Sequence, residues 1–430
     1  MATANADEAT SLLPQHTHPS TDPPNDINND NLDTDIIDES TSLKQTNFSA
    51  GIQIICVIAG TGLLQIPYAL SQAGWLGILI LCCAAVTNCY TGSLISSLMY
   101  MHDPPLNGYA AVGHAAYGVV GEYCVHVFYY CALVGTACLY VILAGMNMCL
   151  LVGCWDERVW MVIVGAVLLI PHISLRTLKE VGITSLIGAI TSAAMVVLVF
   201  ALSLADFNKY ENVVRHDLLN YGSFGSVLAT FCFSYGGNYV YPQVQASMKT
   251  PVAFKRVLIW STLAITCMYL VVGIAAYRTY GHLALSPITL NMSAGLWRTI
   301  CTICITVHVV LACPILLTTF ALDTESVLGI DKLPPAKQLA QVALQRISII
   351  TSVVLISTTI PYFAHVMTLI GAVANTLLIF VFPIVFNAKL VKQGVWGLGL
   401  GCVVVSVGLV GGSLGTADAV SALYRDMLSQ

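Results

Sequence analysis

The sequence predicts an all-α membrane protein with 11 transmembrane helices, of which the first and the sixth are discontinuous. Apolar residues make up 57% of its 430 residues and charged residues only 9%, whereas a soluble protein carries about 45–50% and about 25%. The apolar residues gather in segments of about 20 residues, the length that a helix needs to cross a bilayer. This composition excludes a soluble enzyme, a secreted protein and a nucleic-acid-binding protein.

Residues 1–46 are rich in Asp, Asn, Ser, Thr and Pro, and we expect a disordered acidic cytosolic tail. The tail contains Glu8-Ala-Thr-Ser-Leu12-Leu13, which resembles an acidic dileucine sorting signal for endosomes, lysosomes or vacuoles. Adaptor proteins would read such a signal, although patterns this short also arise by chance.

The transmembrane domain is expected over residues 47–413 and a short polar C-terminal tail over 414–430. We place the spans near residues 48–71, 75–100, 121–152, 159–174, 181–204, 222–247, 256–279, 295–322, 342–360, 363–387 and 395–413.

The Lys and Arg residues predict the orientation, because cytosolic loops carry more of them. With a cytosolic N-terminus, 11 of the 17 lie on the cytosolic side, and each lies in a loop or at a helix end. The odd number of spans then places the C-terminus in the lumen. Asn291-Met-Ser293 becomes a luminal glycosylation sequon, with Asn291 as acceptor.

The cysteines are read as small apolar residues, since nearly all 15 lie within apolar runs. No paired zinc-ligand spacing occurs, and the single CxxC at 301–304 is expected to be packing. We therefore expect no metal site.

The first and sixth spans share an interruption. Gly60-Thr61-Gly62 is followed by Pro67, and Gly236-Gly237 by Pro242, so a proline follows the second glycine by five residues in both. Glycine tolerates non-helical backbone and proline removes an amide donor, so each span can unwind. Interrupted spans at matching places predict inverted repeats around a transporter binding site, here 47–204 and 222–387 with 395–413 added. Alternatively, glycine and proline are simply frequent in membrane helices.

The ends of such broken helices suit an amino acid. An unwound N-terminus presents free N–H groups and a positive dipole end to a carboxylate, and neither span contains an Arg for that task. We expect a zwitterion whose ammonium faces carbonyls or hydroxyls.

Six stretches of the chain resemble the amino acid/auxin permease family, in particular its vesicular inhibitory amino acid transporter and vacuolar amino acid transporter branch. They are Leu63–Ala69 with Gly74–Gly77, Cys89–Gly92, Leu139–Gly145, Phe233–Lys249, Tyr277–Gly281 and Ile360–Phe363. The resemblance covers about residues 47–390. It implies a LeuT-like inverted-repeat fold and secondary transport of amino acids, usually driven by protons.

The resemblance also implies site residues. The substrate carboxylate would meet Gly60, Thr61 and Gly62, and the facing side would be lined by Ser234, Gly236, Gly237 and Asn238. Many vacuolar members carry His where this chain has Asn238, and an amide cannot titrate. The third span has no acid between Cys131 and Leu151, which favours small neutral substrates. Tyr140 and one of the pair Tyr129 and Tyr130 are expected to close over the substrate, unless they face lipid.

Ionisable groups inside spans are functional candidates, and a histidine titrates over the range of an acidifying compartment. We expect proton coupling through His308, midway along the eighth span, and next through His126 in the first turns of the third. Either histidine can instead be a structural hydrogen-bonding residue. Sodium coupling is the rival, with hydroxyls of the eighth span such as Thr306 as ligands.

The sequence therefore predicts a secondary active transporter of small neutral amino acids in a vesicular, vacuolar or lysosomal membrane. It needs no cofactor beyond an ion gradient. Its partners are an amino acid, membrane lipids and adaptor proteins at the tail, and no nucleic acid. A sodium-coupled transporter and an amino-acid-sensing receptor without net transport are the alternatives. No phosphate-binding loop or hydrolytic residue set occurs, so we expect no enzyme.

Overall fold

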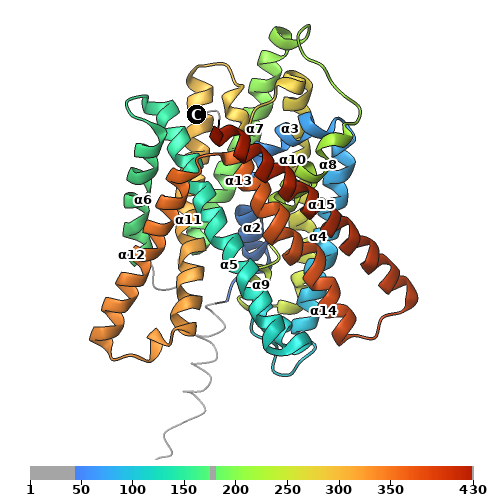
Figure 1. Cartoon of the computed structure of the whole chain (residues 1–430), viewed down its shortest axis with the longest axis vertical. Helices are drawn as coiled ribbons and strands as arrows, with labels where there is room; N and C mark the ends of the chain where they lie inside the picture. The colour runs from blue at the N-terminus through green and yellow to red at the C-terminus, as the bar shows by residue number, and fades with distance from the viewer. Residues whose placement is uncertain (1–43, 175–180, 429–430) are drawn as a thin grey trace, which may run out of the picture. The chain divides into compact units, whose positions relative to one another are not determined.

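Helices build the part of the chain that the structure describes, residues 44–174 and 181–428 of a computed structural model. Residues from Gln45 onward form one unit (Figure 1). The predicted sorting residues Glu8, Leu12 and Leu13 lie outside the described residues.

The first predicted span is two helices, α2 (Asn47–Ile58) and α3 (Gly62–Ala73), whose axes differ by 52°. Thr46 begins α2 as its N-cap, because its side chain accepts a hydrogen bond from Ser49 N at 3.2 Å. The backbone of Gln45 pairs with the connection that follows the sixth predicted span, donating to Ser247 O at 2.8 Å. The predicted tail boundary at 46 is therefore two residues late.

The other helices follow the predicted apolar segments closely. They are α4 (Gly77–Met99), α5 (Tyr109–Val152), α6 (Glu157–Ser174), α7 (Val181–Tyr210), α8 (Phe224–Ser234), α9 (Tyr241–Ala246), α10 (Phe254–Tyr280), α11 (Leu296–Val327), α12 (Pro335–Thr359), α13 (Phe363–Ile370), α14 (Phe382–Leu390) and α15 (Val395–Leu428). Within the described residues, nine helices are long and apolar enough to cross a membrane, and the bent pair α2 and α3 makes ten. The predicted segment 222–247 is divided into the short helices α8 and α9.

Helix α5 begins twelve residues before its predicted span because a short helix precedes a kink. The kink lies at Tyr117 and Gly118, and Gly118 has a φ of +61°, which glycine adopts readily. The two parts of α5 touch at Gly113 and Gly121, where a Cβ on Gly113 would lie 2.6 Å from the carbonyl oxygen of Gly121.

The tenth predicted span is also irregular in its middle. Between α13 and α14 lie two π-helical turns, Gly371–Asn375 and Leu377–Val381. Wider π-turns inside α-helices occur frequently at functional sites.

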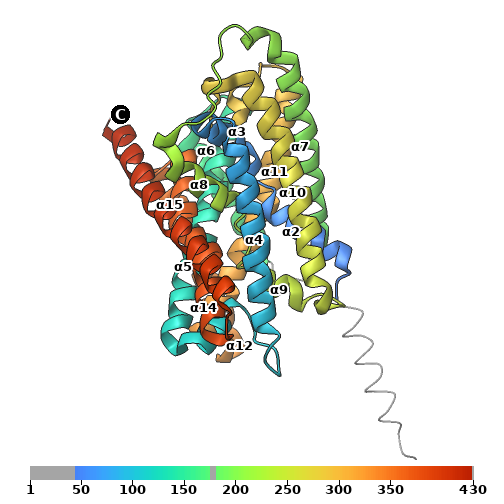
Figure 2. The same ribbon diagram turned by 90° about the vertical axis from the view of Figure 1, so that its right-hand side faces the viewer.

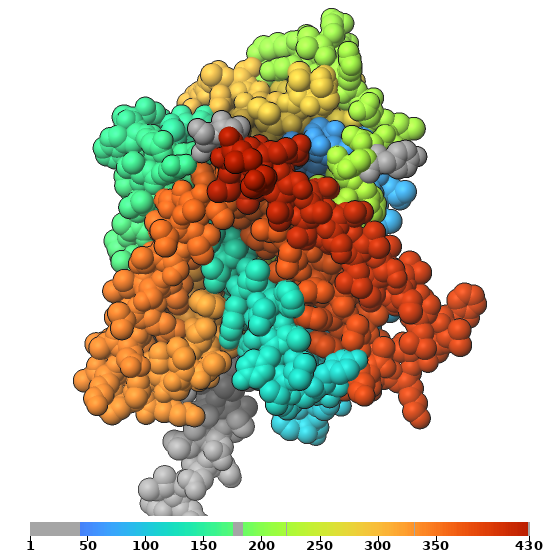
Figure 3. All heavy atoms as spheres, viewed as in Figure 1, coloured from blue at the N-terminus to red at the C-terminus, as the bar shows by residue number. Residues whose placement is uncertain are grey.

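The predicted end of the last helix at 413 is wrong, since α15 continues through Leu428 where a polar tail was expected. Figures 1 and 2 show α15 running obliquely across the other helices, and Figure 3 shows its dark red end at the surface. The polar residues of this part have partners on other helices. Ser226 Oγ of α8 donates to Asp418 at 2.8 Å, and His365 of α13 lies 2.9 Å from Asp426.

Arg346 also departs from the expectation that every basic residue lies in a loop or at a helix end. Helix α12 begins at Pro335, so Arg346 lies well inside it and is 1% exposed. Its Nε donates to Glu325 at 3.2 Å, and its Nη1 donates to the carbonyl of His172, in the last turn of α6, at 2.6 Å. A buried charge needs an ion-pair partner and additional hydrogen bonds, and Arg346 has both.

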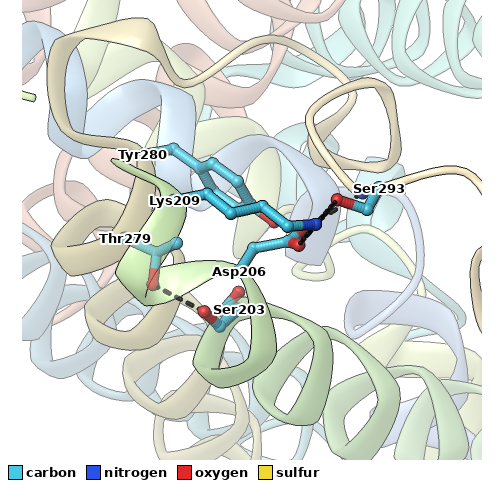
Figure 4. A network of polar contacts seen from close by, with 6 residues as sticks. All are labelled: Ser203, Asp206, Lys209, Thr279, Tyr280 and Ser293. Carbon is cyan, nitrogen blue, oxygen red and sulfur yellow. Dashed lines mark hydrogen bonds and ion pairs between the residues drawn. The ribbon is translucent and has the colours of Figure 1, made fainter. Parts of the chain in front are cut away.

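A polar network fixes the connection between α10 and α11 to the end of α7 (Figure 4). Asp206 is 2% exposed and accepts hydrogen bonds from Ser293 N at 3.0 Å, Lys209 Nζ at 2.8 Å and Tyr280 OH at 3.1 Å. Ser293 is the third residue of the predicted sequon. The amide of Asn291 is engaged in the same connection, donating to Leu283 O at 2.8 Å.

Candidate substrate-binding site

The two helix breaks lie against each other. Helix α8 ends at Ser234 and α9 begins at Tyr241, and the intervening backbone approaches α2 closely. A Cβ on Gly237 would lie 2.7 Å from Cδ1 of Ile58, the last residue of α2. A Cβ on Gly62, the first residue of α3, would lie 3.0 Å from Cα of Ser234. Glycine at both positions therefore permits contact between the breaks.

Tyr269 of α10 joins the two breaks through its hydroxyl. The hydroxyl lies 2.9 Å from the carbonyl oxygen of Ile58 and 2.6 Å from that of Ser234, so its one proton is shared between these two acceptors. These are the last carbonyls of α2 and α8, which a helix end leaves without an intrahelical partner. Tyr269 is completely buried, so no water replaces it.

A small cavity of about 20 Å³ lies between the breaks, which is room for about one water molecule. The end of α2 and the start of α3, the α8–α9 connection, α5, α11 and the first π-helical turn all contribute to its wall. Its lining consists of Val57, Ile58, Thr61, Thr136, Tyr140, Phe233, Gly236, Tyr239, Leu316 and Asn375.

The wall of the cavity offers dipoles and no formal charge. Its polar side chains are four hydroxyls, of Thr61, Thr136, Tyr140 and Tyr239, and the amide of Asn375. The N-terminus of α3 lies beside Thr61, and the C-terminus of α8 beside Phe233 and Gly236. A helix N-terminus favours an anion and a C-terminus favours a cation. These dipoles suit a ligand that carries both charges and is neutral overall, and because about 20 Å³ has room for about one water molecule, such a ligand enters only when the breaks move apart.

Of the residues predicted to bind substrate, the structure brings Thr61, Gly236 and Tyr140 to this cavity. Gly60, Gly62, Gly237 and Ser234 do not line it but lie at or between the helix ends that form the breaks. The side chain of Ser234 is committed to its own helix, donating to Thr230 O at 2.8 Å.

Asn238 and Tyr130, which were also predicted to bind substrate, do not line this cavity. Asn238 is fully buried, but its amide donates to Thr91 Oγ1 of α4 at 3.1 Å. Tyr239, the residue that follows Asn238, is the one that reaches the cavity. Tyr130 lies near the C-terminal end of α11, where its hydroxyl donates to Asp323 at 2.7 Å.

His308 lies against the first break. A Cβ on Gly60 would fall 2.5 Å from its Nε2, so the ring occupies the space that glycine leaves open. On the other side, Nδ1 lies 3.1 Å from the carbonyl of Gly188 and 3.3 Å from Ser192 Oγ, both on α7. A carbonyl only accepts, so Nδ1 carries the proton and Nε2 is a free acceptor. Nε2 is buried without a hydrogen-bond partner in the described residues.

The other two predicted coupling residues lie elsewhere. The ring of His126 is 3.5 Å from Asp323 and 4.0 Å from Glu122, at partly exposed positions of α5 and α11. The hydroxyl of Thr306 donates to the carbonyl of Thr302 at 2.7 Å, which is an ordinary bond for a hydroxyl in a membrane helix. Neither residue lines the cavity. No group of His, Cys, Asp and Glu in the described part of the chain is suited to hold a metal ion.

Sequence reasoning missed Asn375, Tyr239, Thr136 and Tyr269. The position of Tyr239, between Gly237 and Pro242, was a usable signal, because it lies in the predicted break. Asn375 and Thr136 give no such signal, since they sit in apolar segments whose inward face the sequence does not reveal. Tyr269 depends on the packing of α10 against both breaks.

Comparison with known proteins decides the family. The family described as transmembrane amino acid transporter protein matches residues 44–417. The chain belongs to this family, the amino acid/auxin permeases. Its relatives are named as transporters, and the chain is accordingly no enzyme.

The similar proteins include plant and human transporters. Amino acid transporter AVT1D of Arabidopsis thaliana is 27% identical, over 86% of this chain and 69% of its own. Amino acid transporter AVT1I of the same plant is 27% identical, over 89% and 96%. The vesicular inhibitory amino acid transporter of Homo sapiens is 25% identical, over 81% and 70%.

Solved structures share the fold at low sequence identity. A manganese transporter of Eremococcus coleocola superposes with a TM-score of 0.58 at 11% identity, over 89% of this chain and 88% of that chain. A Na⁺-coupled sialic acid symporter superposes with a TM-score of 0.55 at 12% identity, over 87% and 89%. The chain is thus an all-helical, multi-pass membrane protein whose structural neighbours are LeuT-fold-like transporters.

Proposed function

We propose that the protein is a secondary active transporter of small neutral amino acids that works by alternating access. The observation that carries this proposal is the uncharged cavity between two helix breaks. A carboxylate would meet the N-terminus of α3, and an ammonium would meet the C-terminus of α8. The absence of a formal charge on the cavity wall disfavours substrates with a net charge.

The proposed architecture has 11 spans in two inverted repeats, 47–204 and 222–387, with α15 added. Helices α2 and α3 would form the first span, and α8 and α9 the sixth. Broken spans at matching places around a midplane site support it. The N-terminus would be cytosolic and the C-terminus luminal, in a vesicular, vacuolar or lysosomal membrane, and the name of the human relative, a vesicular transporter, supports this location.

Protons are the proposed coupling ion, with His308 as the group that carries them. Its free Nε2 faces the backbone at Gly60, so binding a proton there would place a positive charge and a new donor against the first break. No ion pair engages His308 in the described residues. A proton bound to its ring would therefore add a positive charge that no paired carboxylate neutralises. Histidine is the side chain whose charge ordinarily changes over the pH range that an acidifying organelle covers.

The sodium alternative has less support. It relies on hydroxyls of α11, and none of Thr302, Thr306, Thr318 and Thr319 lines the cavity between the breaks.

Reconstituted uptake tests the proposal. Purified protein in proteoliposomes is given a panel of labelled neutral, cationic and anionic amino acids under an imposed pH gradient or sodium gradient. We expect saturable uptake of small neutral amino acids driven by the pH gradient. Binding of an amino acid without flux under any gradient would point to the sensing receptor instead. Uptake driven by sodium alone would refute proton coupling.

The variant His308→Ala tests the coupling residue. We expect uptake that no longer responds to the pH gradient, while exchange of substrate between the two sides persists. The matched control is His102→Ala, because His102 lies at an exposed position just after α4. Full pH-driven uptake by the His308 variant would remove this residue from the mechanism.

A further inference from the structure

Asn375 contributes an unpaired hydrogen-bond acceptor at the cavity. The residue is 2% exposed and lines the cavity between the breaks. Its Oδ1 is buried and has no hydrogen-bond partner in the described part of the chain. Leaving a buried acceptor unpaired costs about 1–3 kcal/mol. Such a group in the wall of a binding cavity suggests that a ligand satisfies it.

The fold holds Asn375 in this position by two close approaches. A Cβ on Gly236 would lie 2.4 Å from Nδ2 of Asn375, so the amide fills the space that this glycine leaves. A Cβ on Gly371, at the start of the π-helical turn, would lie 2.0 Å from the carbonyl oxygen of Ala229 on α8. The π-turn thus packs directly on α8 and presents Asn375 beside the α8–α9 break.

The position of Asn375 indicates which part of the substrate it meets. The cavity wall has an end suited to an anion, at Thr61 and the start of α3, and an end suited to a cation, at the C-terminus of α8. Asn375 lies against Gly236, two residues beyond the end of α8, and therefore at the end suited to a cation. An ammonium group can only donate hydrogen bonds, and the side-chain oxygen of Asn375 can only accept them.

We infer that Oδ1 of Asn375 accepts a hydrogen bond from the substrate's ammonium and selects for an unmethylated amine. This inference rests on the proposed function and names the recognition residue of that same site. The required amine carries at least one N–H, so an N-trimethylated amino acid has no donor to offer. The competing explanation is a purely structural role, in which the amide only packs the π-turn against Gly236.

The test measures recognition of the amine rather than activity alone. Uptake of the labelled substrate is measured in proteoliposomes for the unaltered protein and for Asn375→Ala, with the amino acid and its N-trimethylated derivative as unlabelled competitors. Asn387→Ala is the matched control, since Asn387 is 9% exposed in α14 of the same span and lies outside the cavity.

We expect Asn375→Ala to raise KM by roughly ten- to a hundredfold, the range for a hydrogen bond to a charged group. Discrimination between the amine and its trimethylated derivative should shrink by a similar factor. Asn387→Ala should change neither. If Asn375→Ala keeps its KM within about twofold and still discriminates, or if it loses affinity for both compounds equally, the inference is wrong.

A second variant, Gly236→Ala, keeps the inference testable if Asn375→Ala fails to fold. Gly236→Ala keeps Asn375 but displaces its amide, because the added methyl would lie 2.4 Å from Nδ2, and the methyl also crowds the carbonyl oxygen of Phe233 at 2.9 Å. It should lose discrimination as Asn375→Ala does, and intact discrimination there would overturn the inference. An unaltered protein that transports no amino acid contradicts the proposed function itself, so the two failures are distinguishable.

Discussion

At the scale of single residues, the site depends on side chains that complete broken backbone. Tyr269 supplies a donor to the last carbonyls of α2 and α8. His308 fills the space beside Gly60, and Asn375 the space beside Gly236. Each of these three side chains comes from a helix other than the break it serves. Gly60 with His308, and Gly236 with Asn375, therefore form pairs in which a side chain at the glycine would displace its partner.

The variant Tyr269→Phe tests the bridge between the breaks. Removing the hydroxyl leaves two buried carbonyls without this donor, so we expect a loss of about 1–3 kcal/mol in stability and slower transport. Thermal unfolding in detergent and uptake in proteoliposomes measure these effects. Tyr235→Phe is the control, because within the described residues that hydroxyl bonds to a side chain, Thr266 Oγ1 at 2.9 Å, and to no helix-end carbonyl. Equal effects of the two variants would contradict a special role for Tyr269.

At the scale of elements, α15 is a long packing helix whose glycines allow close approach. Five of its glycines are buried, Gly401, Gly408, Gly411, Gly412 and Gly415. They contact α8, the π-turns and α14, so α15 supports the elements that carry Phe233, Gly236 and Asn375. Small residues are typical of such contacts between membrane helices, because they let backbones approach closely.

The variant Gly415→Ala tests this packing. Its Cβ would lie 2.7 Å from the carbonyl oxygen of Gly225, a backbone atom that cannot move aside easily. We expect a destabilisation of about 1–3 kcal/mol from overpacking. Gly399→Ala on the same helix meets open space and should be neutral or slightly stabilising, because alanine favours helix. Thermal unfolding of both variants checks the pair, and equal midpoints would argue against tight packing at Gly415.

At the scale of the whole molecule, the alternating helices place the connections in two groups. One group includes the start of α2, the connection after α9 and the turn between α11 and α12. The other includes the α5–α6 turn, the loop between α7 and α8 and the connection that Asp206 holds (Figures 2 and 4). The proposed orientation makes the first group cytosolic.

Chemical labelling tests that orientation. Cys154 is exposed in the turn between α5 and α6 and should face the lumen. In sealed vesicles with the cytosolic side outward, a membrane-impermeant maleimide should label Cys154 only after permeabilisation. Cys154→Ser identifies the signal, because it should abolish the increase. Full labelling of Cys154 in sealed vesicles would invert the proposed orientation.

The sequence by itself predicted the class of protein, the approximate positions of most helices and the interruptions near Gly60–Gly62 and Gly236–Gly237. Apolar length and the glycine–proline interruptions are local properties, and membrane insertion and backbone unwinding depend on them directly. Tertiary structure alone decided which side chains reach the cavity. Asn238 turns toward Thr91 and Tyr130 toward Asp323, while Asn375 enters through a π-turn. The end of α15 was likewise decided by partners such as Ser226, which satisfy polar residues that by sequence belong to a tail. Such contacts join residues far apart in the chain, and no local pattern records them.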